Sequence, residues 1–374
     1  MSNLIELFSG HSANLQQGAA FAATASMASG QTEHSDSTAR DLLSRHYHDG
    51  HIHFCSGWSS GLSTALMACD IKPEDEIIVP ALAPVGIVQA ILLAKARPVL
   101  VDVAADTLLV EQSAIANVLT ERTKAVVVSH LYGQIVQTDA LHEHLREEGI
   151  ALIEDGSDAF CAMANHPRPV GACDIHVGCL PGYREMEGDI PAFVVTRNAE
   201  MHARLRYWSD QGDLSNRLMA AAEGPAHDAP FVDLLSELTK EQDTELANTI
   251  IAINEEQKLI DSHVGFYDEA LGNLGLRSLP RPRNEGRRLC SYPVHISPEK
   301  KTVLFEKLYQ AGFMVYQTYR DIGRLRAFKD SILSDSLDNS TYWSAGAFTL
   351  PTGSMLFAGE EHVLVEMIRN TLES

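Results

Sequence analysis

RTKAVVVSHLYGQ (residues 122–134) and ALIEDGSDAF (residues 151–160) each contain an apolar run of strand length, and an amphipathic segment of helix length lies between them. The order strand, helix, strand is typical of two parallel strands joined by a crossover helix. A parallel sheet binds ligands beyond the carboxyl ends of its strands. His130, Asp155 and Asp158 lie at or just after the ends of these two strands, so they are candidate site residues.

The same alternation extends in both directions along the chain. The expected strands are residues 51–56, 76–80, 97–103, 124–131, 151–156, 174–180 and 192–196. The expected helices between them are residues 60–70, 84–95, 111–119, 138–148 and 199–211. We therefore expect an α/β protein whose large domain has a mostly parallel seven-stranded sheet.

The composition and the apolar pattern of the chain change after about residue 213. Residues 220–232 are rich in Ala, Pro and Gly, which indicates a loop, and a long helical pattern then runs from Leu234 to about Leu271. The rest of the chain has the pattern of a compact α+β unit. We expect an N-terminal arm or helix (residues 1–40), a large α/β domain (41–233), and a connecting helix with a small C-terminal α+β domain (234–374).

Composition narrows the classes of partner. The 374 residues are 45% hydrophobic, and 50 acidic against 29 basic residues give a formal charge of -21. This charge repels phosphate backbones and anionic lipids, so we expect no nucleic-acid or membrane partner and favour a small-molecule substrate. The six cysteines form no CxxC pair and no signal or membrane-spanning segment is recognisable, so we expect a cytoplasmic protein.

Several motifs occur in the same order as in a known family. They are IKPEDEIIVPALAPV (71–85), ARPVLVDV (96–103), RTKAVVVSHLYGQ (122–134), ALIEDGSDAF (151–160) and SNRL (215–218). From about residue 40 to the C-terminus the chain resembles the DegT/DnrJ/StrS family of sugar aminotransferases. The resemblance implies a fold type I aminotransferase-like fold, a homodimer whose sites are completed by the second subunit, and pyridoxal phosphate (PLP) chemistry that begins with a lysine Schiff base.

Two features of the family's cofactor site are retained. SGWSSG (56–61) lies where the family has a turn of small residues that holds the phosphate, so Ser59 and Ser60 are candidate phosphate ligands at a helix N-terminus. Asp155 corresponds to the aspartate that pairs with the protonated pyridine nitrogen. Each has an alternative: Ser59 or Ser60 could simply cap the helix, and Asp155 could be a solvated strand-end carboxylate.

Four positions around the same site depart from the family. Trp58 stands where glycine is usual, and Pro84 stands where an aromatic residue stacks on the ring. Asp158 replaces an amide beside the ring. Asp210 replaces an asparagine that reaches a phosphate of the neighbouring subunit, and a carboxylate there would repel that phosphate.

The segment expected to carry the Schiff-base lysine, DIHVGCLPGYREMEGD (residues 174–189), contains no lysine. One alignment places Arg184 at that position and the other places Gly182 there. A guanidinium stays protonated and cannot form a Schiff base, and His176 comes too early to replace the lysine. The sequence therefore predicts no covalently bound cofactor and makes PLP or pyridoxamine phosphate (PMP) binding doubtful.

Other polar residues could in principle bind a metal ion or an anion. His46, His48, His51 and His53 are close in sequence, but a linear cluster seldom gives converging ligands, so we expect no metal site. Cys179 is expected to be a buried small side chain. In the small domain, four residues could bind an anionic substrate or form a charged surface turn: Tyr316, Tyr319, Arg320 and Arg324.

Three functions are compatible with these patterns. The first is an aminotransferase-fold enzyme without covalent PLP that acts on a small polar metabolite, such as a sugar or an intermediate of specialised biosynthesis. Its candidate polar groups are Asp155, Asp158, Tyr183, Arg184 and His130, the last as an acid or base or as a satisfied strand-end histidine. The second is a non-catalytic partner or scaffold for an active aminotransferase. The third is a PMP-dependent, dehydratase-like enzyme.

Overall fold

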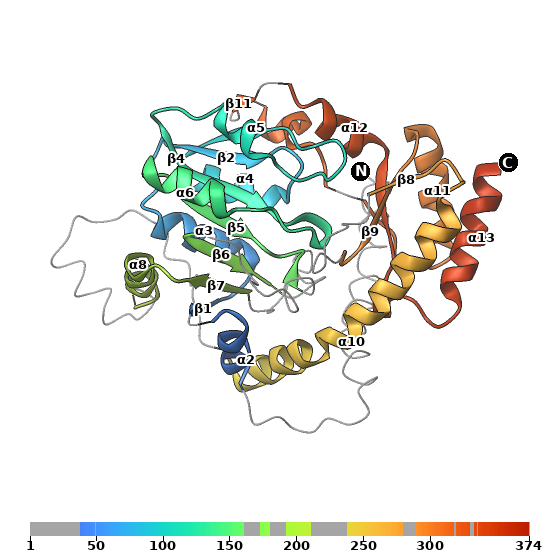
Figure 1. The fold of residues 1–374 in the computed structure, drawn as a ribbon, viewed down its shortest axis with the longest axis horizontal. Coiled ribbons are helices and arrows are strands. Elements are labelled where there is room, and N and C mark those ends of the chain that lie inside the picture. Colours follow the sequence, from blue (N-terminus) through green and yellow to red (C-terminus); the bar gives the residue numbers. More distant parts are fainter. Residues whose placement is uncertain are drawn as a thin grey trace, which may run out of the picture.

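The computed structural model describes residues 38–48, 50–160, 173–179, 192–210, 238–279, 289–317, 319–329, 333–334 and 336–373. In Figure 1 a large sheet with its helices occupies one side of the molecule, and a smaller sheet with the C-terminal helices occupies the other. One long helix, α10 (Lys240–Leu271), connects the two parts.

The large sheet has the strand order β1-β7-β6-β5-β4-β2-β3-β11. Its strands are β1 (His51–Cys55), β2 (Glu76–Pro80), β3 (Arg97–Val101), β4 (Thr123–Ser129), β5 (Ala151–Asp155), β6 (Ile175–Gly178), β7 (Ala192–Thr196) and β11 (Leu333–Ser334). Strands β2 to β6 pair in parallel, whereas β7 pairs antiparallel with β6 and β1. The predicted seven strands and their mostly parallel order are confirmed. The two-residue β11, from the C-terminal part of the chain, adds an eighth strand beside β3.

Helices cover both faces of this sheet, which explains why its central strands are apolar on both sides. The helices are α2 (Ala39–His46), α3 (Trp58–Ala68), α4 (Val85–Leu93), α5 (Gln112–Ala116), α6 (Asp139–Glu147) and α8 (Ala199–Asp210). Alternate β4 residues belong to different cores: Val127 packs with α3 and α4, whereas Val126 packs with α5 and α6. A side chain's position along a strand therefore determines which group of helices it meets.

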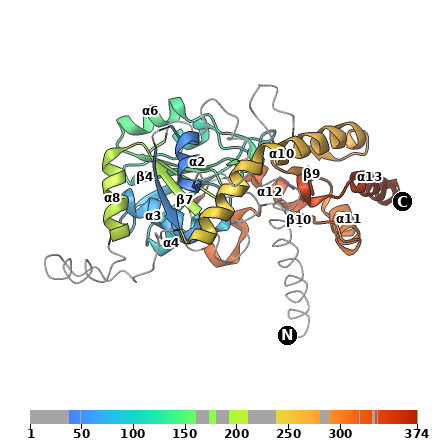
Figure 2. The ribbon, with the colours of Figure 1, turned by 90° about the horizontal axis from the view of Figure 1, so that it is seen from below.

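The C-terminal part forms a four-stranded sheet of order β10-β12-β9-β8. Its elements are β8 (Arg277–Ser278), β9 (Tyr292–His295), α11 (Pro298–Gln310), β10 (Tyr316–Gln317), α12 (Asp338–Gly346), β12 (Ala347–Leu350) and α13 (Glu360–Glu373). Short 3-10 turns lie at Leu131–Gly133, Ile322–Arg324, Arg326–Phe328 and Gly353–Met355. A capping box of Thr239 and Gln242 starts α10. This helix contacts α2 and α13, and Figure 2 shows it running from the large-sheet part to the C-terminal part.

The proposed domain limits near residues 40 and 233 stay predictions, because residues 1–37 and 211–237 lie outside the described part of the chain. Among the helices that are described, none is both long enough and apolar enough to cross a membrane.

Candidate active site

Asp155 ends β5 at the carboxyl edge of the large sheet and is 1% exposed. Its Oδ1 atom accepts hydrogen bonds from the backbone N–H of Ser157 at 3.1 Å and from Nε1 of Trp58 at 3.0 Å. A buried carboxylate needs such donors, because an unpartnered charge is costly away from water. Among the described residues, the side chain that donates to Asp155 is the indole of Trp58.

Trp58 is the first residue of α3, yet its side chain is only 8% exposed. The six-membered ring of the indole lies against Gly86 in the first turn of α4, and a Cβ at residue 86 would come within 2.5 Å of Cζ3 of Trp58. This close approach requires glycine at position 86. The indole thus extends from the carboxylate of Asp155 to the start of α4.

The two candidate phosphate ligands lie at the N-terminus of α3. The hydroxyl of Ser60 donates to the carbonyl of Gly57 at 2.6 Å and accepts from the N–H of Gly57 at 2.9 Å. Ser59 is exposed. Ser60 therefore makes the local helix-capping contacts that the sequence left open as the alternative to ligand binding.

Asp158 is partly exposed and joins the two parts of the molecule. Its Oδ2 atom accepts from the hydroxyl of Tyr319 at 2.5 Å and from the N–H of Tyr132 at 3.3 Å. The thiol of Cys290 donates to the backbone carbonyl of Asp158. Because Tyr319 and Cys290 belong to the C-terminal part, the surroundings of Asp158 combine residues of the large-sheet part with residues of the C-terminal part.

His130 lies on the other face of the sheet. It is fully buried, its Nδ1 atom accepts from the N–H of Val136 at 3.1 Å, and its Nε2 atom is 3.5 Å from Oε2 of Glu154. Glu154 precedes Asp155 in β5, and neighbouring strand residues point to opposite faces. The structure thus brings His130 to Glu154 rather than to Asp155, and its role as an acid or base stays a prediction.

Glu154 is the centre of this buried cluster. Thr138 donates to its Oε1 atom at 2.6 Å, and Nδ1 of His176 lies 3.6 Å from its Oε2 atom. The hydroxyl of Tyr47 is 3.3 Å from Nε2 of His176. Burial acts to raise the pKa of Glu154, but the contacts with His130 and His176 outweigh it and hold the pKa below its usual range. Burial also lowers the pKa of His176, which opposes a charge on that ring.

Sequence reasoning missed both the Glu154 cluster and the contact between Trp58 and Asp155. The signal for the cluster was available: His176 is a polar residue inside an otherwise apolar strand, and Gly156 makes room for its ring, since a Cβ at residue 156 would lie 2.2 Å from Cε1 of His176. The candidates Tyr183 and Arg184 lie outside the described residues, as does the side chain of Asp210.

The N-terminal histidines separate in the fold. His53 and His202 place ring nitrogens 3.0 Å apart, and His51 stacks on His202 with ring centroids 3.8 Å apart. His46 packs instead against Tyr47. Within the described ranges, no group of three or more ligand-type side chains is arranged to hold a metal ion.

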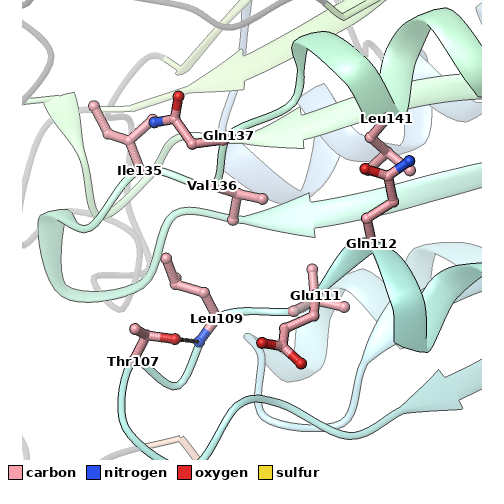
Figure 3. A pocket seen from close by; sticks show the side chains of 9 residues that line it. Thr107, Leu109, Glu111, Gln112, Ile135, Val136, Gln137 and Leu141 are labelled. Carbon is pink, nitrogen blue, oxygen red and sulfur yellow. Dashed lines mark hydrogen bonds between the residues drawn. The ribbon is translucent and has the colours of Figure 1, made fainter.

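A surface hollow of about 330 Å³ lies beside the loops that follow β3 and β4 (Figure 3). It is lined by Thr107, Leu109, Val110, Glu111, Gln112, Ile135, Val136, Gln137 and Leu141. No candidate site residue contributes to it. We therefore place the candidate site at Asp155 and Asp158 and not in this hollow.

Lowering the pH from 7 towards 4 should lower the free energy of unfolding. Burial lowers the pKa of His46 and that of His53 to about 4 in each case. Between pH 6.5 and 4 the unfolded chain binds protons that the folded chain does not, so stability falls as the pH falls through that window. Urea denaturation at each pH measures this effect.

His46→Phe is the matched variant for this prediction, because it keeps a ring against Tyr47 and removes one titrating group. Its stability should fall less steeply between pH 6.5 and 4. An unchanged slope would mean that His46 does not contribute to the pH dependence.

The chain is similar in sequence and in fold to known aminotransferases. The model of the DegT/DnrJ/EryC1/StrS aminotransferase family matches residues 22–369. The chain is 29% identical over 244 residues to L-glutamine:2-deoxy-scyllo-inosose aminotransferase from Streptomyces fradiae, covering 63% of this chain and 55% of that protein. It is 27% identical over 227 residues to GDP-perosamine synthase from Caulobacter vibrioides, covering 61% and 59%. The chain thus matches less than two thirds of the length of these relatives.

Solved structures share the fold. The aminotransferase TlmJ from Streptoalloteichus hindustanus has a TM-score of 0.71 at 22% identity, with 90% of this chain and 89% of that chain covered. DesV from S. venezuelae, solved with a ketimine intermediate, has a TM-score of 0.74 at 19% identity, with 98% and 97% covered. The predicted fold type I aminotransferase-like architecture is confirmed.

The expectation that no cofactor is covalently bound, with PLP or PMP binding doubtful, is contradicted by these comparisons. A matching Streptococcus pneumoniae protein has been solved in both its PLP form and its PMP form, with TM-scores of 0.72 and 0.71. The expectation rested on residues 174–189, and residues 180–191 lie outside the described part of the chain. The site also retains two features that favour a phosphate-bearing cofactor: the strand-end carboxylate of Asp155 and the helix N-terminus at Ser59 and Ser60.

The described residues do not fit a cofactor ring as they now stand. The Oδ1 atom of Asp155 already accepts the indole N–H of Trp58, so the indole edge stands where a pyridine nitrogen would approach that atom. Trp58 also takes up the space beside Gly86.

Proposed function

Since the chain belongs to the DegT/DnrJ/EryC1/StrS aminotransferase family, we propose that it is a divergent enzyme of that family acting on a small, hydroxyl-rich molecule of the sugar or cyclitol class. The curated relatives support this substrate class, because their names describe an inosose and a perosamine product. The observation that carries the proposal is the hydrogen bond from the hydroxyl of Tyr319 to Asp158. This bond places a tyrosine of the C-terminal part next to a carboxylate at the carboxyl edge of the large sheet.

The chemistry of this edge suits such a substrate. Carboxylates accept hydrogen bonds from sugar hydroxyls, and a partly exposed carboxylate can also hold or release a proton. Asp158 is the partly exposed one, whereas Asp155 is buried behind Trp58. We propose that Asp158 and Tyr319 bind and orient the substrate, and that Tyr183 and Arg184 add polar contacts from their own segment.

We expect 2-deoxy-scyllo-inosose to bind the wild-type chain measurably in calorimetric titration. Asp158→Asn, which keeps the volume but removes the charge, and Tyr319→Phe, which removes the hydroxyl, should each weaken binding roughly tenfold, because each loses a hydrogen bond to a charged group. Asp106→Asn, at an exposed position, serves as the matched control and should bind like wild type.

If neither this cyclitol nor a panel of nucleotide sugars binds, the enzyme proposal fails, and the non-catalytic partner becomes the favoured function. Binding that is unaffected by both variants would contradict the assignment of Asp158 and Tyr319 as substrate-binding residues.

We also propose that the reaction is not standard transamination, because residues 174–189 contain no lysine. Incubation with L-glutamine and 2-deoxy-scyllo-inosose should then give no amino-cyclitol by mass spectrometry, and formation of that product would refute this part. We propose in addition that the protein is a homodimer. Light scattering after gel filtration measures its molar mass in solution.

A further inference from the structure

The side chain of Trp58 is the least expected feature of the site. It stands at the first position of α3, and this indole is 8% exposed. Two contacts with described residues hold it. Its Nε1 atom donates to Asp155 at 3.0 Å, and its benzene edge lies against the bare backbone of Gly86.

These two contacts match what a flat aromatic ligand with one N–H donor would make. The carboxylate of Asp155 accepts from the edge of a ring, and Gly86 leaves room for the other edge. Pro84, which comes just before α4, has no aromatic surface to offer. The aromatic group next to Asp155 is therefore supplied by the chain itself.

We propose that Trp58 is an intramolecular occupant of the ring position, and that a pyridoxal-type ring reaches Asp155 only after the indole has turned out of the pocket. The hydrogen bond to Asp155 and the burial of the indole both stabilise the closed arrangement. The proposal rests on the contacts of Trp58 and on the family's cofactor class, and not on the substrate class proposed above.

A closed arrangement lowers the affinity for the cofactor in a predictable way. When only a fraction of molecules is open, the apparent dissociation constant rises by the inverse of that fraction. Removing the indole makes every molecule open. Trp58→Ala should therefore bind PMP about tenfold or more tightly than wild type. Trp58→Phe keeps a ring but loses the N–H donor, so it should bind with an intermediate affinity.

Equilibrium dialysis of PMP against wild type, Trp58→Ala and Trp58→Phe measures these affinities in the absence of substrate. The proposal is overturned if wild type binds PMP as tightly as Trp58→Ala, or if none of the three binds PMP. Both results are independent of cyclitol binding at Asp158, so failure of this proposal and failure of the proposed function are distinguishable.

A second readout uses the indole itself and does not depend on the folding of Trp58→Ala. Saturating wild type with PMP should shift tryptophan emission to longer wavelength, because Trp58 moves from a buried to a solvated position. Trp58→Phe retains the two other tryptophans and should not show this shift. PMP binding to wild type without a shift, or the same shift in Trp58→Phe, would contradict displacement of the indole.

Discussion

Glu154→Ala is expected to lower the free energy of unfolding by about 3–5 kcal/mol, because it leaves several fully buried polar groups without the carboxylate that they face. Its loss leaves the hydroxyl of Thr138 and the rings of His130 and His176 without their carboxylate. These groups are buried, so water cannot replace the lost partner without reorganising the core. Urea denaturation monitored by circular dichroism measures the change.

Two further variants separate charge from packing in this prediction. Glu154→Gln keeps an acceptor for Thr138 and removes the charge, so it should cost less than Glu154→Ala. Glu255→Ala is the exposed control, because Glu255 pairs with Lys258 at the surface, and its effect should stay within about 0.5 kcal/mol. A loss below about 1 kcal/mol for Glu154→Ala would mean that the cluster is not a stabilising unit.

The sign of the pH dependence of Glu154 follows from its pKa, which is lower in the folded chain than its usual value. Its contribution to stability is complete above the pKa of an unfolded-state glutamate, about 4.3. It is lost as the pH falls below that value towards the pKa of the folded state. This window lies below that of His46 and His53, so the two effects are separable in an acid titration.

Asp102→Ala is expected to lower the free energy of unfolding by about 2–3 kcal/mol, because Asp102 caps a distant helix. Its Oδ1 atom accepts from the N–H of Ser340 at 2.8 Å and from the hydroxyl of Ser340 at 2.6 Å. Its Oδ2 atom accepts from the N–H of Asn339 at 2.8 Å. Asp102 follows β3, whereas Ser340 and Asn339 lie in the first turn of α12, so these bonds join the two parts of the molecule.

The same variant tests how the site edge is held. Asp321 follows Tyr319 closely in sequence, and α12 holds Asp321 through Thr341 and Ser344. If α12 loosens in Asp102→Ala, Tyr319 is positioned less well and the affinity for the cyclitol should fall together with stability. Asp106→Ala, in the same loop, is the matched control. If Asp102→Ala is as stable as wild type, the carboxylate of Asp102 does not stabilise the start of α12.

The local pattern of apolar residues predicted most of the large sheet. β2 and β7 have the expected bounds, and β1 ends one residue early. Helix starts were less predictable: α3 begins at Trp58 instead of residue 60, because Ser60 makes the capping contacts with Gly57. The two-residue β11 was missed, because a strand so short has no periodicity and exists only through its pairing with β3.

For the candidate site, the residues were predictable from the sequence and their partners were not. Asp155 and Asp158 were predictable from the sequence, because a polar residue at the carboxyl end of a buried parallel strand faces the ligand side of the sheet. The partners of these residues were not. Tyr319 lies 161 positions from Asp158, and Trp58 lies 97 positions from Asp155. No local spacing rule covers separations of that size.

Residue types and their local order are enough to establish the α/β class, the order of the strands along the chain, the family, and the absence of lysine from residues 174–189. These depend on residue type and on periodicity over short distances. The contact of the indole of Trp58 with Asp155, and that of His130 with Glu154 on the opposite face, became visible only in the folded chain. Side-chain direction depends on how strands pair and helices pack, and those contacts join residues far apart in the chain.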